Sequence, residues 1–557
     1  MNAAPRAVNP VKSRWEFWTV FLAAFVLLAI LHLPFLRLPY FWDEAGYYVP
    51  AALDFYRHGL LIPRLTLPNG HTPLLMIYLS GIWLLAGFRV LTTRLAMILI
   101  AAATVATTYR LGSQAAGREA GVLAALLLAL SPTFFAQSSL VYPSLPAALF
   151  TTLAVFLALD RRWTWTTLAL SLAVLSYEIS VIAVPVIWAF LYFRVRERRA
   201  QIWALSAAPV ILLGLWAMYY HHATGFWTGN SGYLQYNLYS ALHPLHILRG
   251  FIARVAKVFV LGFDWIVVAG AGAGIWFTRK RSRSAAPGPD PGSASCKNDF
   301  VDFRFLALGL IAIYIVFLSV IGGAVLSRYL MPVFPVFYIL CVMLIGRLPR
   351  RAARLVCFLA AVGFVGAWYV NPPYPFPYDD NLSYATFVRL HERAAQYLQS
   401  QPGDPVISSA WPAVAELIEP YLGYVSHPLK VAPMNDFRPA AFANLPRFDL
   451  LYLYSREWDP ANDWPRAVPA LRPIARLLGY QPPVRPSALV ARFHLTLLKE
   501  FRDRGQWVRI YAAPPLAENK AGRSIRSLPT LKRREAVHPS GSLTTSLMVM
   551  RRTPRQE

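Results

Sequence analysis

The sequence predicts an all-α polytopic membrane protein followed by a small C-terminal α/β domain. Of its 557 residues, 56% are hydrophobic and only 15% are charged, and the mean hydropathy is +0.41. Soluble domains average about 25% charged residues. The net charge of +26 could suggest a nucleic-acid partner, but the basic residues lie in turns between apolar runs, the pattern of cytoplasmic loops. Nucleic acid is therefore excluded, and three cysteines are too few for a disulfide scaffold.

The first span is Trp18–Leu36, which contains no Asp, Glu, Lys or Arg. Arg6, Lys12 and Arg14 precede it and predict a cytoplasmic N-terminus. The segment Pro39–His71 then lies outside. The next apolar run, Thr72–Phe88, is short and begins at a proline. We interpret it as an interfacial helix, because every later basic turn then falls on the cytoplasmic side.

If the later apolar runs cross the membrane alternately outward and inward, the chain has about eleven spans in total. The turns on the cytoplasmic side are then basic throughout. The protein is accordingly expected in the cell inner (plasma) membrane, with its C-terminal domain extracytoplasmic. The remaining spans are Leu95–Thr108, Ala120–Phe135, Pro146–Leu159, Trp165–Ser176, Ile179–Phe193, Trp203–Tyr220, Phe251–Phe277, Phe305–Ile321, Tyr329–Ile345 and Leu355–Val370.

The character of the chain changes after Val370, where the proline-rich segment Asn371–Pro377 marks a boundary. We divide the chain into a membrane domain (1–370), an α/β domain (371–515) and a basic tail expected to be disordered (516–557). Alternating strands and helices predict the α/β class. The expected strands are Pro405–Ala410, Asp449–Tyr454 and Trp507–Tyr511, and the expected helices are Tyr384–Ser400 and Pro412–Tyr421.

Two adjacent carboxylates, Asp43 and Glu44, follow the first span in an aromatic setting. Carboxylates near membrane depth are costly and are usually paired or functional. Such a group could accept a proton from an acceptor hydroxyl or coordinate a cation. The alternative is an interfacial charge inside an aromatic belt.

Three further polar residues fall on the outer side in this topology. His71 opens the interfacial helix and could be a base, a ligand, a phosphate contact or an ordinary loop residue. Glu178 lies between two spans, either as a lone turn carboxylate or as a wall of the same outer cavity. Arg328 stands at the outer mouth of a span, where its fork matches phosphate oxygens and the alternative is snorkelling.

His221 and His222 are adjacent and lie in an aromatic loop rich in Asn and Gln. Neighbouring histidines could bind a metal, but no suitably spaced Cys or His accompanies them, so we assign no metal site. A sugar-stacking surface fits the same residues equally well. The sequence contains no P-loop or GxGxxG motif, which leaves ATP-driven transport without support.

Taken together, these motifs resemble the GT-C membrane glycosyltransferases. The likeness spans residues 15 to 345 and is nearest to the branch that holds glycosyltransferase family 39, protein O-mannosyltransferases and lipid A aminoarabinose transferases. The matching motifs are the acid pair Asp43-Glu44, the His71-x-Pro-Leu helix start, Arg94-Leu95, and Arg328-Tyr329-Leu-x-Pro.

The resemblance implies sugar transfer from a polyprenyl-phosphate donor to a lipid, glycan or protein acceptor at the outer face. It implies that Asp43 deprotonates the acceptor hydroxyl and that Glu44 tunes its charge. Arg328 and His71 would hold the leaving phosphate, and His221 or His222 would line the cavity. No cofactor is implied with certainty, and an assisting divalent cation stays open.

One departure from the family pattern concerns a second acid in the outer loop after the third span. In this chain the loop Gln137–Pro146 has no acid. Tyr142 and Ser144 could substitute, Glu178 could take the charge, or the activity could be lost or altered. Two other classes therefore stay open: a transporter or flippase, and a non-catalytic assembly protein for lipid-linked saccharides. A transporter would be favoured by inverted repeats, which the sequence does not display.

Overall fold

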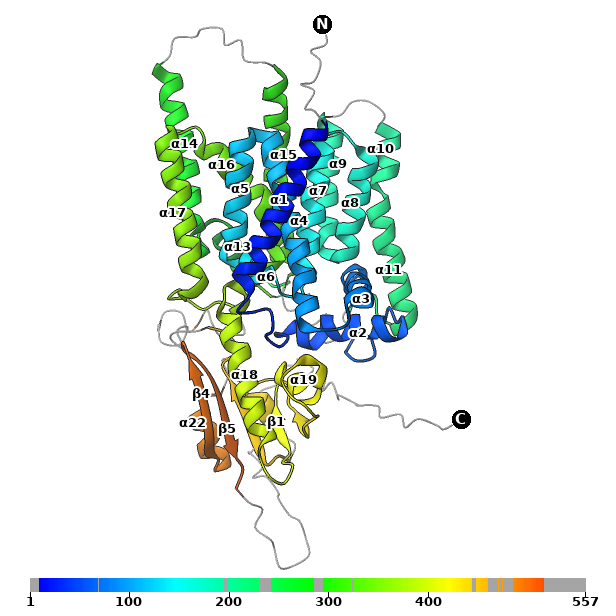
Figure 1. Cartoon of the computed structure of the whole chain (residues 1–557), viewed down its shortest axis with the longest axis vertical. Helices are drawn as coiled ribbons and strands as arrows, with labels where there is room; N and C mark the ends of the chain where they lie inside the picture. Colours follow the sequence, from blue (N-terminus) through cyan, green and yellow to red (C-terminus); the bar gives the residue numbers. More distant parts are fainter. Residues whose placement is uncertain are drawn as a thin grey trace, which may run out of the picture. The chain divides into compact units, whose positions relative to one another are not determined.

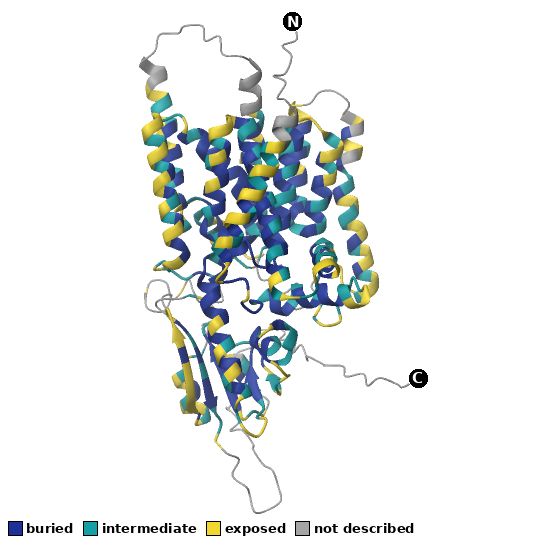
Figure 2. Cartoon of the chain, in the orientation of Figure 1, coloured by how far each residue is buried: buried dark blue, intermediate teal, exposed yellow. Residues whose placement is uncertain are grey.

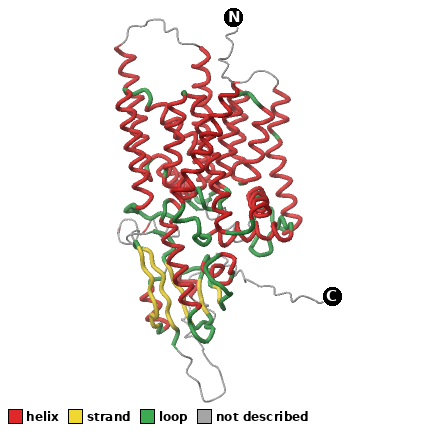
Figure 3. Tube along the Cα trace, in the orientation of Figure 1, coloured by secondary structure: helices red, strands yellow, loops and turns green. Residues whose placement is uncertain are grey.

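The computed structural model describes residues 10–68, 70–194, 199–229, 242–284, 294–322, 324–442, 447–458 and 484–514, with positions 469 and 473. Helices dominate these residues, and the strands are confined to the region after residue 406 (Figure 3). The described residues up to Ala513 belong to one compact unit. The tail expected beyond residue 515 lies outside the described residues.

Seven helical segments among the described residues are long and apolar enough to cross a bilayer, which makes this a multi-pass membrane protein. They lie in α1 (Pro10–His32), α4 (Val90–Ala116), α10–α11 (Arg199–Ser206, Ala208–Thr224), α13–α14 (Pro244–Phe259, Asp264–Ser284), α15 (Ala294–Ile321), η5–α16 (Ser327–Val333, Phe334–Ile345) and α17 (Arg350–Tyr369).

Four other expected spans correspond to shorter helices. These are α5 (Arg118–Leu130), α7 (Ser144–Leu159), α8 (Trp163–Ser176) and the pair η2–α9 (Glu178–Ile182, Ala183–Arg194). The 13 residues of α5 rise about 20 Å, less than the roughly 30 Å of a hydrocarbon core. The total of eleven crossings therefore stays a prediction.

Apolar side chains are distributed as a lipid-facing bundle requires. Large exposed hydrophobic residues lie along α1, α11 and α17, whereas α4 is buried among α1, α5 and α7 (Figure 2). α4 and α5 approach closely because both contribute a glycine at their contact. A Cβ atom on Gly112 would lie 3.0 Å from the Cα of Gly121. Small residues allow such close helix packing in membranes.

The run expected to be interfacial forms α3 (Leu74–Ala86), which packs on α2 (Val49–His58) and α4. In Figure 1 α3 is seen almost end-on, whereas α4, α5 and α7 run lengthwise. Its 13 residues are also short for a crossing. Both observations agree with the interfacial interpretation.

The expected span Phe251–Phe277 lies within one candidate membrane segment, Pro244–Lys280, but its helix is interrupted. α13 ends at Phe259 and α14 begins at Asp264, with the short turn η4 (Leu261–Phe263) between them. Gly262 adopts φ +64°, a left-handed conformation that ends a helix and that glycine adopts without strain. α13 packs along α15, and α14 packs against α16 and α17. The break opens space that the site uses.

The region after α17 contains a five-stranded sheet in the order β2-β1-β3-β5-β4. β1 pairs parallel with β2 and β3, and β5 pairs antiparallel with β3 and β4. The expected strands and helices are confirmed as β1, β3, β5, α18 and α19, and β2 and β4 were not anticipated. The bounds are β1 Ile407–Ser409, β2 Val431–Pro433, β3 Leu450–Tyr454, β4 Thr496–Asp503, β5 Gln506–Ala512, α18 Ser383–Gln399, α19 Ala413–Ile418 and α22 Pro486–Phe493.

Two contacts connect the helices with the region that contains the sheet. η6 (Tyr378–Asp380) follows α17 and packs on α6 (Pro132–Gln137). Near the start of the chain, the loop before η1 (Glu44–Tyr48) bonds to the turn η7 (Pro420–Leu422), with Tyr40 N donating to Leu422 O at 3.3 Å. Tyr424 returns a hydrogen bond from its hydroxyl to Tyr40 O at 3.0 Å.

We expect Gly121→Ala to destabilise the protein by about 1–3 kcal/mol, the usual result of overpacking a tight contact. A Cβ atom there would lie 2.5 Å from the backbone oxygen of Tyr109. Thermal unfolding of the purified protein in detergent measures the effect. The matched control is Gly214→Ala in α11, whose Cβ meets open space and which should not lower the melting temperature. Equal melting temperatures of Gly121→Ala and Gly214→Ala would contradict the tight contact between α4 and α5.

Candidate functional site

The centre of the candidate site is a buried arginine held between two carboxylates. Arg328, the second residue of η5, donates from Nη2 to Asp43 Oδ2 and from Nη1 to Asp379 Oδ2, the latter at 2.7 Å. The side chains of Arg328 and Asp379 are 6% and 5% exposed, and that of Asp43 is 18% exposed. Three distant parts of the sequence therefore meet at one guanidinium.

Burying this guanidinium is costly unless its charge and its donors are satisfied. The two carboxylates supply the charge, and the ring of Tyr142 lies 4.2 Å below the guanidinium carbon as a cation–π partner. Tyr329 contributes a second ring at 5.7 Å. Gln137 donates from Nε2 to Asp379 Oδ2 at 3.1 Å and to its backbone oxygen at 3.0 Å, which keeps that carboxylate in place.

Asp43 is the most accessible member of this group, and its environment makes it more basic than an ordinary aspartate. Burial is the main cause that raises the pKa of Asp43, because the charged form loses its hydration. Arg328 opposes this rise, whereas the negative charge of Asp379 adds to it. A carboxylate with a raised pKa is suited to take up a proton.

A second buried cation is held by the chain neighbours of Arg328 and Asp379. Lys257, in the last turn of α13, donates to Asp380 Oδ2 and to Ser327 Oγ, both at 2.8 Å. Ser327 and Arg328 are consecutive, as are Asp379 and Asp380. Consecutive carboxylates of η6 therefore each hold one cation: Asp379 holds Arg328 and Asp380 holds Lys257.

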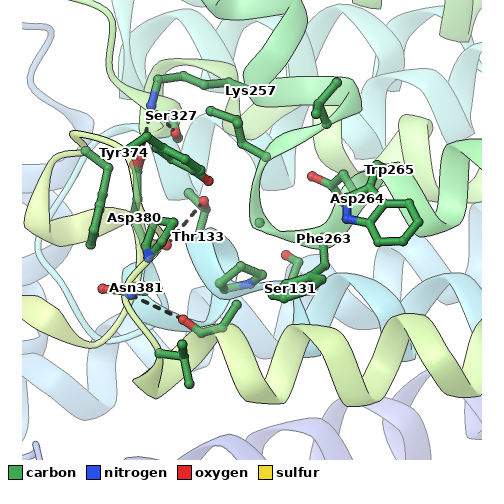
Figure 4. Close-up of a pocket in the computed structure, with 18 of the residues that line it drawn as sticks. Ser131, Thr133, Lys257, Phe263, Asp264, Trp265, Ser327, Tyr374, Asp380 and Asn381 are labelled. Carbon is green, nitrogen blue, oxygen red and sulfur yellow. Dashed lines mark hydrogen bonds and ion pairs between the residues drawn. The ribbon is translucent and has the colours of Figure 1, made fainter. Parts of the chain in front are cut away.

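A cavity of about 350 Å³ is lined by Lys257, Ser327 and Asp380. Arg328, Asp43 and Asp379 are not among its lining residues. Figure 4 shows Lys257, Ser327 and Asp380 gathered on one side and Phe263, Asp264 and Trp265 on the other. Its apolar walls come from Val260, Leu261, Phe263, Trp265, Phe334 and Val370. It is therefore an amphipathic cavity that has the Lys257–Asp380 ion pair at one end and mostly apolar walls.

His71 and Glu178 come together, as one interpretation of the sequence expected. His71 Nδ1 lies 2.9 Å from Glu178 Oε1, and His71 Nε2 lies 3.2 Å from the Tyr48 hydroxyl. The ring of Tyr48 packs edge-on against Tyr142, 5.7 Å between centroids. These contacts run from Glu178 and His71 through Tyr48 to Tyr142, whose ring packs on Arg328.

Glu44 faces away from Asp43 and has no exposed surface. It pairs with Arg94, and its oxygens also accept from the backbone N of Phe41 at 2.7 Å and of Val141 at 2.5 Å. Arg94 in turn donates to Ser139 O at 2.9 Å. The motif residues Glu44 and Arg94 thus form a buried pair that pins two loops, and the structure gives Glu44 a positioning role.

His221 and His222 end α11 on the same side as His71, since Trp216 of α11 donates to Gly70 O at 3.1 Å. The ring of His221 stacks on Trp227 at 4.1 Å, and His222 is exposed. The rest of their loop, residues 230–241, lies outside the described residues. Within the described ranges, no three His, Cys, Asp or Glu side chains gather as a metal site.

Four residues of the cluster escaped the sequence reasoning: Gln137, Lys257, Asp379 and Asp380. The segment that carries the aspartates is interpreted above only as a proline-rich boundary. Lys257 fell inside the apolar run that was expected to be a single span. A signal was available for three of them, since charged residues in an apolar run and an Asp-Asp pair beside aromatic residues are both unusual at membrane depth. Gln137 gave no such signal.

Comparison with known proteins places the fold. No family model and no curated protein matches the sequence. Among solved structures, ArnT from Cupriavidus metallidurans bound to undecaprenyl phosphate is similar, with 12% identity and a TM-score of 0.53, covering 88% of this chain and 98% of ArnT. The oligosaccharyltransferase AglB from Archaeoglobus fulgidus aligns with 13% identity and a TM-score of 0.44, covering 79% and 69%. The fold is therefore similar to that of ArnT, which agrees with the predicted resemblance to the GT-C membrane glycosyltransferases.

We expect Glu44→Gln to lower the stability of the protein by about 3–5 kcal/mol, because it leaves Arg94 buried without its counter-charge. Arg94 is 1% exposed, so water cannot replace the lost partner. Glu119→Gln is the control, since Glu119 and Arg354 are both more than 60% exposed. Thermal melting in detergent compares the two, and an unchanged melting temperature for Glu44→Gln would refute this role.

Proposed function

We propose that this protein transfers a sugar from a polyprenyl-phosphate-linked donor to a hydroxyl group of a lipid, glycan or protein acceptor. The reaction takes place at the outer face of the inner (plasma) membrane, with the N-terminus cytoplasmic and the region after α17 extracytoplasmic. The observation that carries the proposal is the buried centre at which Arg328 meets the carboxylate of Asp43. A second cation, Lys257, is paired with the residue after Asp379 and lines an amphipathic cavity.

The cavity matches the chemistry of a lipid phosphate. Its apolar walls can receive part of an isoprenoid chain, and Lys257 can bind a phosphate group in place of Asp380. A guanidinium fork and an ammonium group together offer several donors to phosphate oxygens. The likeness of the fold to an ArnT structure with bound undecaprenyl phosphate supports the same class of donor.

Donor binding requires an exchange of ion pairs. Arg328 and Lys257 carry two positive charges, and Asp43, Asp379 and Asp380 carry three negative charges when ionised. A phosphodiester adds a further negative charge, which disfavours keeping every carboxylate ionised. We infer that the phosphate replaces Asp43 on Arg328, which frees the Asp43 carboxylate to take a proton.

In the transfer step, the acceptor oxygen displaces the phosphate from the anomeric carbon of the sugar. Asp43 takes the proton of the acceptor hydroxyl, and the acceptor oxygen forms a bond with the anomeric carbon of the sugar. The bond from that carbon to the phosphate oxygen breaks, and its electron pair leaves with polyprenyl phosphate. Arg328 and Lys257 stabilise the charge that develops on this phosphate. His71, held by Glu178, supplies a further phosphate contact in this proposal.

The first test measures release of polyprenyl phosphate from a panel of labelled polyprenyl-phosphate sugars, by the purified protein in lipid. Asp43→Asn should lower turnover by about 10²–10⁴-fold, the usual contribution of a general base, while the donor still binds. Arg328→Gln should instead weaken donor binding. Asp404→Asn, at a side chain that is 59% exposed, should leave both unchanged.

The outcomes separate the classes of function. Wild-type protein that binds the donors but releases no polyprenyl phosphate would contradict the enzyme and favour a transporter or an assembly protein. The same assay with and without EDTA tests whether a divalent cation assists. The donor that is consumed identifies the sugar.

The proposed orientation predicts which cysteines an impermeant thiol reagent reaches in intact cells. In a background without the native cysteines, Lys430→Cys in the region after α17 should be labelled, since Lys430 is 62% exposed. Arg351→Cys, at the start of α17, should be labelled only after permeabilisation. The reverse labelling pattern would show that the topology is opposite to the one proposed.

A further inference from the structure

Asp379 holds a place in the site that no motif assigned to it. It belongs to η6, which follows the proline-rich segment after α17. Its carboxylate accepts from Arg328 at 2.7 Å and from Gln137 at 3.1 Å, and its side chain is 5% exposed. A carboxylate buried this deeply at a cationic centre, with both hydrogen bonds directed at its Oδ2, is poorly explained as a surface turn residue.

The geometry around Arg328 makes Asp379 the fixed partner and Asp43 the exchangeable one. Each terminal nitrogen of Arg328 is bonded to a different carboxylate. Asp379 is further restrained by Gln137, whereas Asp43 is the more exposed of the two. If a phosphate displaces Asp43, the bond to Asp379 keeps the guanidinium pointing the same way.

The charges around Asp43 also distinguish the roles of Arg328 and Asp379. The charged and titratable groups that face Asp43 are Arg328 from η5, Asp379 from η6, His71 from the loop before α3, Tyr47 from η1 and Tyr142 from the loop before α7. Of these, Arg328 is the strongest influence that makes Asp43 less basic. Asp379 partly neutralises that cation.

We propose that Asp379 is a positioning residue of the transfer site: it fixes Arg328 for the donor phosphate and offsets the positive charge of Arg328 next to Asp43. This inference rests on the proposed function. It also accounts for the loop Gln137–Pro146, which has no acid of its own. The loop uses Gln137 to hold a carboxylate that another part of the chain supplies.

The test compares the pH dependence of kcat for wild type and Asp379→Asn. Asp379→Asn removes a negative charge that raises the pKa of Asp43 and offsets Arg328, so the pKa of Asp43 falls. Because Asp43 works when deprotonated, the acidic limb of kcat should move to lower pH, by roughly one unit or more. The weaker base should also lower the plateau of kcat, while donor affinity is kept or increased, because the site has lost a negative charge.

Two companion variants separate this role from simple support of the fold. Asp379→Glu keeps the charge and should restore the position of the acidic limb. Gln137→Met keeps Asp379 charged but releases it, and should lower kcat with the limb unmoved. Asp404→Asn, at an exposed side chain, is the matched control. An unmoved limb in Asp379→Asn, or a loss of donor affinity in proportion to kcat, would overturn the proposal.

A measurement that needs no turnover keeps this inference separate from the proposed function. Infrared difference spectra can follow the protonation of Asp43, whose band is identified by its loss in Asp43→Asn. The band should titrate at lower pH in Asp379→Asn than in wild type. If wild type turns over no donor, the proposed function fails, and the infrared titration still decides whether Asp379 keeps Asp43 basic.

Discussion

The ion pairs of Arg328 are the interaction on which the site depends. A guanidinium at 6% exposure has little access to water, so its charge must be matched by the protein. The match comes from Asp43 after the first helix and from Asp379 after the last long helix. These bonds join the start and end of the bundle at one point and place a basic carboxylate beside a cation.

The break between α13 and α14 is the second constraint. A continuous helix would fill the space with its own turns and would carry Lys257 past the site. The left-handed turn at Gly262 instead ends α13 with Lys257 next to Ser327 and leaves a cavity lined by both helices. The break, which contains the left-handed residues Gly262 and Phe263, therefore places Lys257 at the edge of an apolar space.

Much of the fold could be predicted from the sequence because the signals are local. Uninterrupted apolar runs and basic turns predicted the long helices, and short alternating patterns predicted β1, β3, β5 and α18. β2 was not predicted, since three residues make no pattern, and β4 was not predicted, since its charged edge-strand residues resemble a loop. Glu44 was placed beside Asp43 in sequence but faces Arg94, because adjacent residues of a helical turn point in different directions.

The sequence by itself determined the membrane class, the interfacial helix, the GT-C resemblance and the importance of Asp43, His71 and Arg328 as candidates. These follow from composition, periodicity and short motifs, which residues close in the chain carry. Only the tertiary structure decided the partners: Asp379 for Arg328, Asp380 for Lys257 and Glu178 for His71. Such pairs join residues about 50 to 120 positions apart. They could not be predicted because a desolvated charge pairs with whichever opposite charge the folded chain brings near it. Local sequence does not encode that proximity.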